Sequence, residues 1–274
     1  MRFRVLVAAA FLIVSALSVR AQGTPDAPPQ TGVPVDAALN PALPTVFIVG
    51  DSTARNGADL GWGDHVAALF DTARINVANR ARAGRSSRTY INEGMWAKTL
   101  AEMKPGDFLL LQMGHNDGGD LGGAKPRGTL KGIGEETQQV PQTTGPLAGQ
   151  VETVHTYGWY VRTMIGQAKA KGVTPILLTL TIRNIWKDGK IERDMGYTGY
   201  LRQIGAAEGV LVVDPATIEA DRLEALGPEK TALLFPADHT HTSAAGAELV
   251  AECVVAALRA SGASLAKYLT ATAP

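Results

Sequence analysis

The sequence has a single cysteine, Cys253, among its 274 residues. One cysteine excludes an internal disulfide and a zinc site built on thiolates, so the stability of the fold must come from packing. Cys253 lies within the apolar stretch VAECVVAAL. Because a free cysteine in such a stretch is commonly buried, we expect a core residue rather than a reactive thiol.

An excess of charge of either sign is missing as well. The chain carries 26 basic and 26 acidic residues, and aromatic residues make up only 6% of it. Nucleic-acid-binding proteins usually show a basic patch or stripe, so we expect no nucleic acid among the partners. No histidines have the spacing of a metal site, and we expect neither a metal nor another cofactor.

Long apolar runs are missing after the first residues of the chain. Val5–Leu17 is an apolar run of 13 residues behind a basic start, and small residues precede a cut after Ala21. This pattern predicts a secretory signal peptide over residues 1–21. A retained N-terminal anchor is the alternative, although a membrane span needs about 20 apolar residues. We therefore expect a secreted or periplasmic protein without membrane contact once the signal is removed.

Composition divides the rest of the chain. Residues 22–44 are rich in Pro, Ala and Gly and follow neither helical nor strand periodicity, which predicts a flexible lead-in. Residues 45–274 have the length of one α/β domain. Two stretches interrupt its elements: a Gly-rich insertion over residues 118–153, and a polar segment over residues 182–196 with a turn at Asp188-Gly189. A loop as long as the insertion is usually functional or mobile.

Short apolar strands alternate with helices through this domain. Apolar residues at spacings of three to four predict helices, and short runs that are apolar throughout predict strands buried on both faces. We expect strands at 46–49, 75–78, 108–112, 174–180 and 210–213, and helices at 63–70, 87–100 (interrupted at Gly94), 155–171, 197–207 and 242–259. This order predicts an α/β fold: a three-layer αβα sandwich with a mostly parallel five-stranded sheet, of the flavodoxin-like kind.

Polar residues follow the first three strands and precede the last helix. They supply Ser52, Gly84, Asn116 and the pair Asp238 and His241. Ligand sites of parallel sheets lie outside the carboxyl ends of the strands, so these groups can meet there. Histidine can take the proton of a serine nucleophile, and a carboxylate can orient the imidazole. The N–H groups of Ser52 and Gly84 and the amide of Asn116 are candidate donors to an oxyanion.

Each of these pieces also has a plain structural interpretation. Gly-Asp-Ser after a strand is most often a turn or a helix cap, and Asn116 and Asp117 fit a turn equally well. His239 also neighbours Asp238, but adjacent side chains diverge in an extended backbone, which favours His241 as the base. We expect Asp51 to hold its loop by bonding nearby backbone N–H groups rather than to act as the triad acid.

Taken together, the motifs resemble those of the SGNH, or GDSL-type, hydrolases. The four blocks of that family match GDST at Ser52, RAGRS at Gly84, GHND at Asn116 and DHTH from Asp238, within residues 45–258. The strings GWGDHV, RGTLKGIGEET and FPADHTHTS resemble the rhamnogalacturonan acetylesterase branch of the carbohydrate esterases. One departure is that some members read Thr-Pro-Val-X-Arg where residues 179–183 of this chain read TLTIR.

The resemblance implies a metal-free triad with Ser52 as nucleophile, His241 as base and Asp238 as the acid that orients it. It also implies an oxyanion hole formed by Ser52, Gly84 and Asn116. Aromatic and cationic side chains near these groups suit a sugar ring and its carboxylate. The candidate substrate contacts are Trp62, Tyr157, Trp159, Arg183, Trp186 and His239, with core packing as the alternative for at least one of Tyr157 and Trp159.

The expected function is that of a secreted enzyme that removes acetyl groups from a pectic polysaccharide, rhamnogalacturonan, through an acyl-enzyme. One alternative is a related esterase acting on acetylated xylan, on cell-wall glycan or on short-chain esters. Another is a carbohydrate-binding protein that has lost catalysis. An acetylated polysaccharide is the expected partner, and we expect the protein to be a monomer.

Overall fold

The computed structural model describes residues 38–57 and 60–274. The signal peptide expected over residues 1–21 and most of the expected lead-in lie outside these ranges. Residues 38–44 form no helix or strand. The Asn40 backbone N–H donates to Asn76 Oδ1 at 2.9 Å, and Asn76 Nδ2 donates to the Asn40 carbonyl at 2.9 Å. The end of the lead-in is therefore attached to the strand that begins at Asn76.

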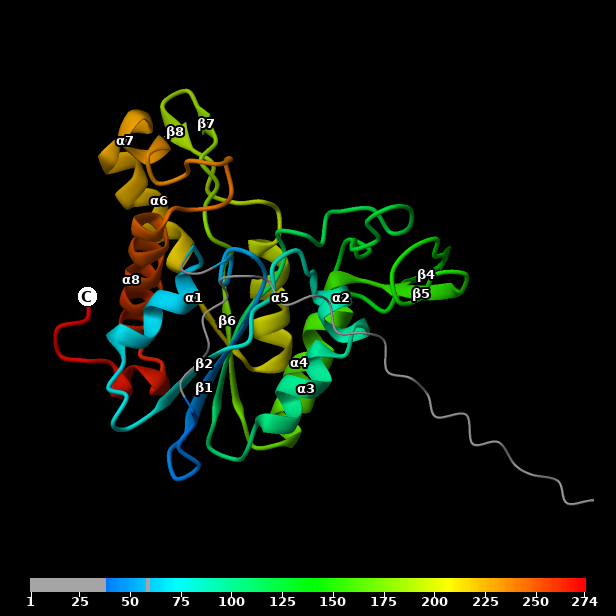
Figure 1. Ribbon diagram of the computed structural model, residues 1–274, viewed down its shortest axis with the longest axis horizontal. Helices are drawn as coiled ribbons and strands as arrows, with labels where there is room; N and C mark the ends of the chain where they lie inside the picture. Colours follow the sequence, from blue (N-terminus) through cyan, green and yellow to red (C-terminus); the bar gives the residue numbers. More distant parts are fainter. Residues whose placement is uncertain (1–37, 58–59) are drawn as a thin grey trace, which may run out of the picture.

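A sheet of five parallel strands forms the centre of the fold (Figure 1). Its spatial order is β2-β1-β3-β6-β9, with β1 (Thr45–Gly50), β2 (Asn76–Asn79), β3 (Phe108–Gln112), β6 (Thr174–Leu178) and β9 (Leu211–Val213). β1 and β3 are buried along their whole length, as their unbroken apolar runs predict. All five expected strands are present, and the parallel sheet confirms the α/β prediction.

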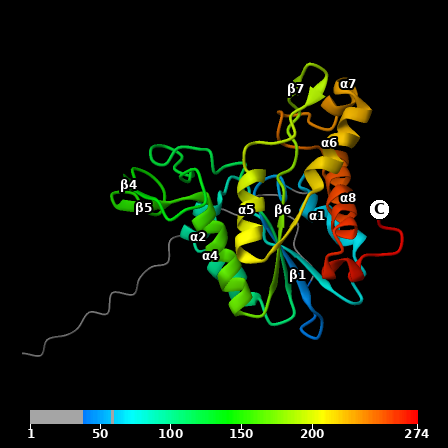
Figure 2. The same ribbon diagram turned by 180° about the vertical axis from the view of Figure 1, so that it is seen from behind.

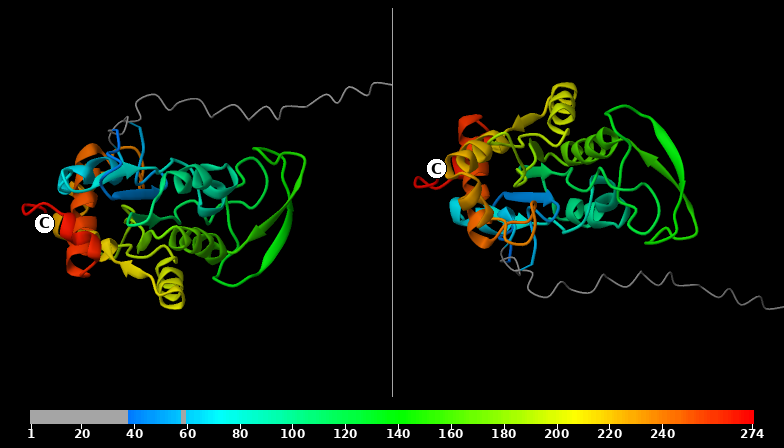
Figure 3. Two further views of the ribbon diagram at one scale, coloured as in Figure 1. Left: turned by 90° about the horizontal axis from the view of Figure 1, so that it is seen from below. Right: turned by 90° about the horizontal axis from the view of Figure 1, so that it is seen from above.

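Helices cover both faces of the sheet and form an apolar core with each (Figure 3). The first face carries α1 (Trp62–His65), η1 (Val66–Leu69), α6 (Pro215–Leu226), α8 (Ala244–Ala260) and η2 (Ser264–Tyr268), with the short α7 (Pro228–Ala232) after α6. The second face carries α2 (Ser87–Asn92), α3 (Met95–Glu102), α4 (Tyr157–Ala170) and α5 (Thr198–Glu208). Because neighbouring strand residues point to opposite faces, Ile48 packs in the first core and Phe47 and Val49 in the second. Cys253 of α8 is fully buried, as expected.

Local signals set the ends of the helices on the second face. Ser86 caps α2 in a capping box with Thr89, in which each side chain accepts the backbone N–H of the other residue. Gly94 has φ 76° and separates α2 from α3, at the interruption expected there. The helix expected from His155 begins two residues later, because His155 ends strand β5 (Val151–His155).

The insertion at residues 118–153 contains a hairpin, where the sequence showed only a long loop. β4 (Thr137–Pro141) pairs with β5 in antiparallel register, and Figure 2 shows the hairpin extending away from the sheet. A buried ion pair between Arg88 of α2 and Glu152 of β5 holds its base. Arg88 Nη1 also donates to the carbonyl oxygen of Gly128 at 2.7 Å. Arg88 therefore anchors the insertion at two separate points.

The second polar segment forms a smaller hairpin of β7 (Trp186–Lys187) and β8 (Lys190–Ile191). Asp188 and Gly189 have φ values of 51° and 75°, which confirms the turn expected at these two residues.

Candidate active site

Ser52, His241 and Asp238 form a continuous chain of hydrogen bonds at the carboxyl ends of the strands. His241 Nε2 lies 2.9 Å from Ser52 Oγ, and His241 Nδ1 lies 2.7 Å from Asp238 Oδ2. Ser52 follows β1, whereas both of its partners precede α8. With a hydrogen on Nδ1 bonded to Asp238, Nε2 faces the serine as an acceptor. This arrangement is the one that a general base for a serine nucleophile requires.

The loop before α8 folds around the carboxylate of Asp238. Asp238 Oδ1 accepts the backbone N–H groups of Thr240 at 2.7 Å and of His241 at 2.8 Å. Burial raises the pKa of Asp238, but the hydrogen bonds from the His241 ring and from these two N–H groups outweigh it and hold the pKa at about 2. Thr242 Oγ1 donates to the Leu60 carbonyl at 2.9 Å, which joins this loop to the segment that follows Ser52. Asp238 is therefore ionised at neutral pH and can stabilise a charged His241.

Buried polar contacts fix the turn that presents Ser52. Asp51 Oδ1 accepts the Thr53 backbone N–H at 2.9 Å and the Thr53 hydroxyl at 3.0 Å, which is the bonding expected for Asp51. Gly61 packs so closely on this turn that a Cβ there would lie 2.5 Å from the Arg55 backbone nitrogen. Only glycine fits at that position, and the turn is held from both sides.

The three candidate oxyanion donors lie in the loops after β1, β2 and β3, which are neighbours in the sheet. The backbone N–H groups of Ser52 and Gly84 donate to no acceptor within the described ranges. Asn116 Nδ2 donates to the Arg85 carbonyl at 2.9 Å, which ties the amide to the Gly84 loop and leaves its second hydrogen available. Ser52 and Asn116 are 7% and 8% exposed. Donors in such a shielded place can stabilise developing negative charge.

Two buried residues beside Asn116 were not assigned a definite role from the sequence. Asp117 is fully buried and accepts the Ser87 backbone N–H at 3.1 Å as well as the Ser87 hydroxyl. Burial raises the pKa of Asp117 to about 7, although the hydrogen bonds from Ser87 favour ionisation. The side chain of His115 is buried next to Asp51. The available signal was a run of polar residues directly after a fully buried strand, where a buried polar group needs partners.

Two of the candidate sugar contacts are wrong, because the structure buries them in the core. Trp62 is fully buried, and its indole N–H donates to Gln112 Oε1 at 2.7 Å. Tyr157 is fully buried, and its hydroxyl donates to the Met113 carbonyl at 2.7 Å. Each ring has its polar group satisfied inside the protein, so neither is accessible to a glycan.

The other candidates near the triad lie at the surface. The backbone N–H of Asn184 donates to the carbonyl oxygen of His239 at 2.8 Å, so the loop after β6 lies beside the triad loop. Trp186 is partly buried, and its indole N–H donates to Asn184 Oδ1 at 2.8 Å. Arg183 directly precedes Asn184 in this loop and is partly buried. Arg183, Trp186 and His239 thus border the site from one side.

Trp159 stacks on the ring of His155, with the ring centroids 3.8 Å apart, at the base of the β4–β5 hairpin.

Among residues 38–57 and 60–274, no group of three or more His, Cys, Asp or Glu side chains is placed to hold a metal ion. Within the same ranges, the helices are too short or too polar to span a bilayer.

Comparison with known proteins identifies the family. The model of the GDSL-like Lipase/Acylhydrolase family matches residues 48–249. A rhamnogalacturonan acetylesterase of Emericella nidulans is 32% identical over 229 residues, which cover 83% of this chain and 90% of that protein. A probable rhamnogalacturonan acetylesterase of Bacillus subtilis is 29% identical, with 82% of this chain and 96% of the relative covered.

A solved structure with low sequence identity to this chain has the same fold. The YxiM protein of Bacillus subtilis is 25% identical with a TM-score of 0.63, and the match covers 81% of this chain. This chain spans only 58% of that larger protein. The matches confirm the resemblance carried by the four sequence blocks. The chain therefore belongs to the GDSL-like lipase/acylhydrolase family and is an ester hydrolase.

Proposed function

We propose that the protein is an exported carbohydrate esterase that removes O-acetyl groups from rhamnogalacturonan. The observation that carries the proposal is the unbroken hydrogen-bonded chain Ser52–His241–Asp238 beside three donors. The choice of a pectic substrate rests on the similarity to two relatives that bear the name rhamnogalacturonan acetylesterase. The apolar N-terminal run supports export, and a polysaccharide of the plant cell wall is met outside the cell.

The first half-reaction forms an acetyl-enzyme. His241 Nε2 takes the proton of Ser52 while Oγ attacks the acetyl carbonyl carbon. The carbonyl oxygen becomes an oxyanion that accepts hydrogen bonds from the Ser52 and Gly84 N–H groups and from the Asn116 amide. The positive charge on His241 is stabilised by ionised Asp238. His241 then gives its proton to the sugar oxygen, the ester C–O bond breaks, and the sugar leaves with a free hydroxyl.

The second half-reaction releases acetate. A water molecule gives its proton to His241 Nε2 and attacks the acetyl carbon, and the same three donors stabilise the second oxyanion. The bond to Ser52 Oγ breaks as His241 returns the proton to the serine. Acetic acid leaves and ionises in solution, and the enzyme is restored without any further co-reactant.

Arg183 supplies a recognition element for a pectic chain. Galacturonate units carry a carboxylate, and a guanidinium can bind such a group through two parallel hydrogen bonds. Arg183 Nε is buried without a hydrogen-bond partner within the described residues, and the loop of Arg183 lies beside the triad loop. We propose that Arg183 binds the carboxylate of the acetylated unit or of its neighbour, and that Trp186 and His239 border the same subsite.

Acetate release from acetylated rhamnogalacturonan, acetylated xylan and a chromogenic acetate ester tests the proposal. We expect the wild-type enzyme to act on rhamnogalacturonan, and Ser52→Ala to lose about 10⁴-fold or more of the rate on every substrate. Ser261→Ala, which changes a serine at the end of α8, is the matched control and should keep full activity. Full activity of Ser52→Ala would refute the mechanism. Activity on xylan without activity on rhamnogalacturonan would refute the substrate, and no hydrolysis at all would indicate a binding protein.

A further inference from the structure

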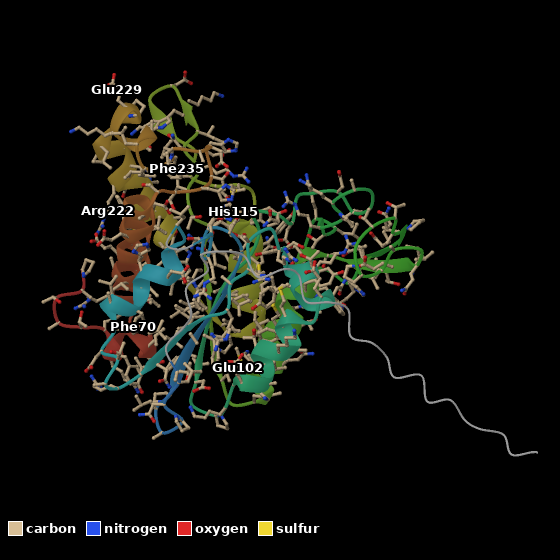
Figure 4. The ribbon with its side chains drawn as sticks, viewed as in Figure 1. Phe70, Glu102, His115, Arg222, Glu229 and Phe235 are labelled. Atoms are coloured by element: carbon tan, nitrogen blue, oxygen red, sulfur yellow. The ribbon has the colours of Figure 1, made fainter. Side chains whose placement is uncertain are left out.

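His115 belongs to the loop after β3 and contacts two further loops, those after β1 and β6. It lies in the loop after β3, and Figure 4 shows it near the upper end of the sheet. His115 Nε2 lies 3.1 Å from the Thr181 carbonyl oxygen and 3.3 Å from Thr181 Oγ1, in the loop after β6. His115 Nδ1 lies 3.4 Å from Asp51 Oδ2, in the loop after β1. The side chain is 2% exposed, so protein groups rather than water surround the ring.

Acceptors face the imidazole on both sides. A carbonyl oxygen can only accept, so Nε2 must carry a hydrogen to bond the main chain of Thr181. A carboxylate oxygen also only accepts, so a bare Nδ1 would place two lone pairs opposite each other in buried surroundings. Nδ1 and Asp51 Oδ2 approach each other only as a charge contact, and neither atom has a hydrogen-bond partner within the described residues. A hydrogen on both nitrogens makes each of these contacts favourable and turns the ring into an imidazolium.

The other contacts of Asp51 place the shared proton on the histidine rather than on the carboxylate. Asp51 Oδ1 accepts the backbone N–H and the hydroxyl of Thr53, and two donors favour the ionised form. Burial raises the pKa of Asp51, but the neighbouring His115 ring and the bonds from Thr53 outweigh it and lower the pKa. Two further titratable groups are close: Asp117, which interacts favourably with a charged His115, and Tyr157, which burial keeps neutral by raising its pKa.

The two residues of this pair each precede a candidate oxyanion donor. Ser52 directly follows Asp51, and Asn116 directly follows His115. A contact between Asp51 and His115 therefore fixes the β1 loop against the β3 loop where both donors must converge on one oxygen atom. The bond to Thr181 adds a third attachment that keeps the ring from turning. We propose that His115 is a buried imidazolium that positions the Ser52 N–H and the Asn116 amide by tying together the loops after β1, β3 and β6.

The kinetic part of this inference rests on the proposed esterase function, whereas the charge of the ring does not. His115 contacts Asp51 and Thr181 rather than Ser52 Oγ, so it is a positioning residue. A donor displaced by about 1 Å can cost about 10²-fold in rate. We therefore expect His115→Gln to lower kcat by about 10²-fold and to leave KM almost unchanged, because substrate contacts elsewhere remain.

Nuclear magnetic resonance of the intact protein with isotope-labelled histidine nitrogens tests the charge without any turnover. A neutral ring gives one protonated and one bare nitrogen signal, whereas an imidazolium gives two protonated ones. The signals of His115 are those lost in His115→Gln. We expect two protonated nitrogens for His115 at neutral pH, in the wild type and in Ser52→Ala alike. In Asp51→Asn, which removes the charge, we expect the ring to become neutral. A neutral ring in the wild type, or a charged ring in Asp51→Asn, would overturn the proposal.

A double-mutant cycle with Asn116→Ala tests the positioning. Asn116→Ala alone should lower kcat by about 10²–10³-fold, as the loss of an oxyanion donor does. If His115 acts by placing that donor, the double variant falls short of the product of the two single effects by about tenfold or more. If the double variant instead loses kcat by the full product of the two single effects, His115 does not act through the Asn116 amide.

Thr181→Val is the matched control for the third attachment. It removes Oγ1 and keeps the carbonyl oxygen that accepts from His115. Retained kcat and a retained charged ring support the main-chain bond. A neutral ring in Thr181→Val would mean that the hydroxyl, rather than the carbonyl oxygen, had been accepting the hydrogen on Nε2, which contradicts the main-chain bond. Should Ser52→Ala remain fully active, the esterase mechanism fails while the ring measurement still decides the charge of His115.

Discussion

The ring of His241 lies between Ser52 and Asp238, whereas His239, two residues earlier in the same loop, contacts the loop after β6 through its carbonyl oxygen. This difference separates two histidines that both follow Asp238 within three residues in the sequence. The base must reach both the serine hydroxyl and the orienting carboxylate, and the geometry gives both contacts to His241.

Replacement of each histidine by alanine should therefore have unequal effects. We expect His241→Ala to lose about 10⁴-fold or more of kcat on the chromogenic acetate, because Ser52 then has no base. His239→Ala should stay within about tenfold of the wild type, since its main-chain contact is kept. The steady-state kinetics of the two purified variants check this, and the reverse order would refute the assignment of the base.

Gly84 adopts φ 76°, and a Cβ built there would meet no atom within 4 Å. Gly84→Ala is therefore opposed by backbone strain alone, which costs about 1–2 kcal/mol. Relief of that strain would turn the Gly84 N–H away from the oxyanion, so we expect kcat to fall by about tenfold or more together with stability. Gly166→Ala, in the exposed part of α4 where a Cβ also meets nothing, is the control. It should stabilise the protein by about 0.5–1 kcal/mol at unchanged kcat, as urea unfolding will show.

If Arg183 binds a substrate carboxylate, its replacement should affect the KM for a polysaccharide but not the turnover of a simple ester. Loss of one charge-assisted hydrogen bond pair should raise KM for acetylated rhamnogalacturonan by about tenfold in Arg183→Ala. Turnover of the chromogenic acetate, which has no carboxylate, should not change. Arg193→Ala, which removes an exposed arginine paired with Asp221 and Glu224, should leave both substrates unaffected. Equal losses on both substrates in Arg183→Ala would indicate a role in folding or chemistry instead.

Glu219 of α6 predicts an unusual dependence of stability on pH. The side chain is buried, one oxygen accepts the Ile182 backbone N–H at 3.1 Å, and burial raises the pKa from 4.5 to about 8. Below pH 4.5 both folded and unfolded chains keep this proton. Between that pH and about 8 the unfolded chain has released the proton while the folded chain still holds it, so the free energy of unfolding falls as pH rises. Above pH 8 both chains are ionised, and the free energy of unfolding falls no further through Glu219.

Glu219→Gln removes this titration and keeps an oxygen for the Ile182 N–H. We expect the variant to be more stable than the wild type at pH 8, with a smaller decline in unfolding free energy from pH 5 to pH 8. Urea unfolding at the two pH values measures the decline. A wild type and a variant with parallel pH profiles would show that Glu219 is ionised in the folded protein.

The sequence was sufficient for the sheet and for the main parts of the site, for reasons that are local. Each strand is a short apolar run, and each functional residue lies in the loop after a strand or before the last helix. The loops after parallel strands meet at one edge of the sheet, where polar groups can gather. The chemical needs of a serine nucleophile then pointed to His241 as the base and to Asp238 as the carboxylate that orients it, and the family resemblance implied the same residues.

Packing decided what the sequence left open. Trp62 and Tyr157 are close to site motifs in the sequence, yet both rings are buried in the core. Their hydrogen-bond partners, Gln112 and the Met113 carbonyl, are distant in the chain, so the sequence alone did not reveal this burial. The β4–β5 hairpin was missed for a similar reason, because its strands are short and mostly polar and its base depends on the distant Arg88. The charge on Asp117 and the environment of His115 also arise only when separate loops meet.

The last helix links catalysis to the completion of the fold. His241 stands 189 residues after Ser52, and α8, which covers one face of the sheet, follows it directly. All five strands of the sheet are made before this segment. During synthesis, the nucleophile and the oxyanion donors are therefore made long before the base. The base is made just before α8, which packs in the first core. Ester hydrolysis by this protein therefore requires a chain that extends at least to His241, beyond every strand of the sheet.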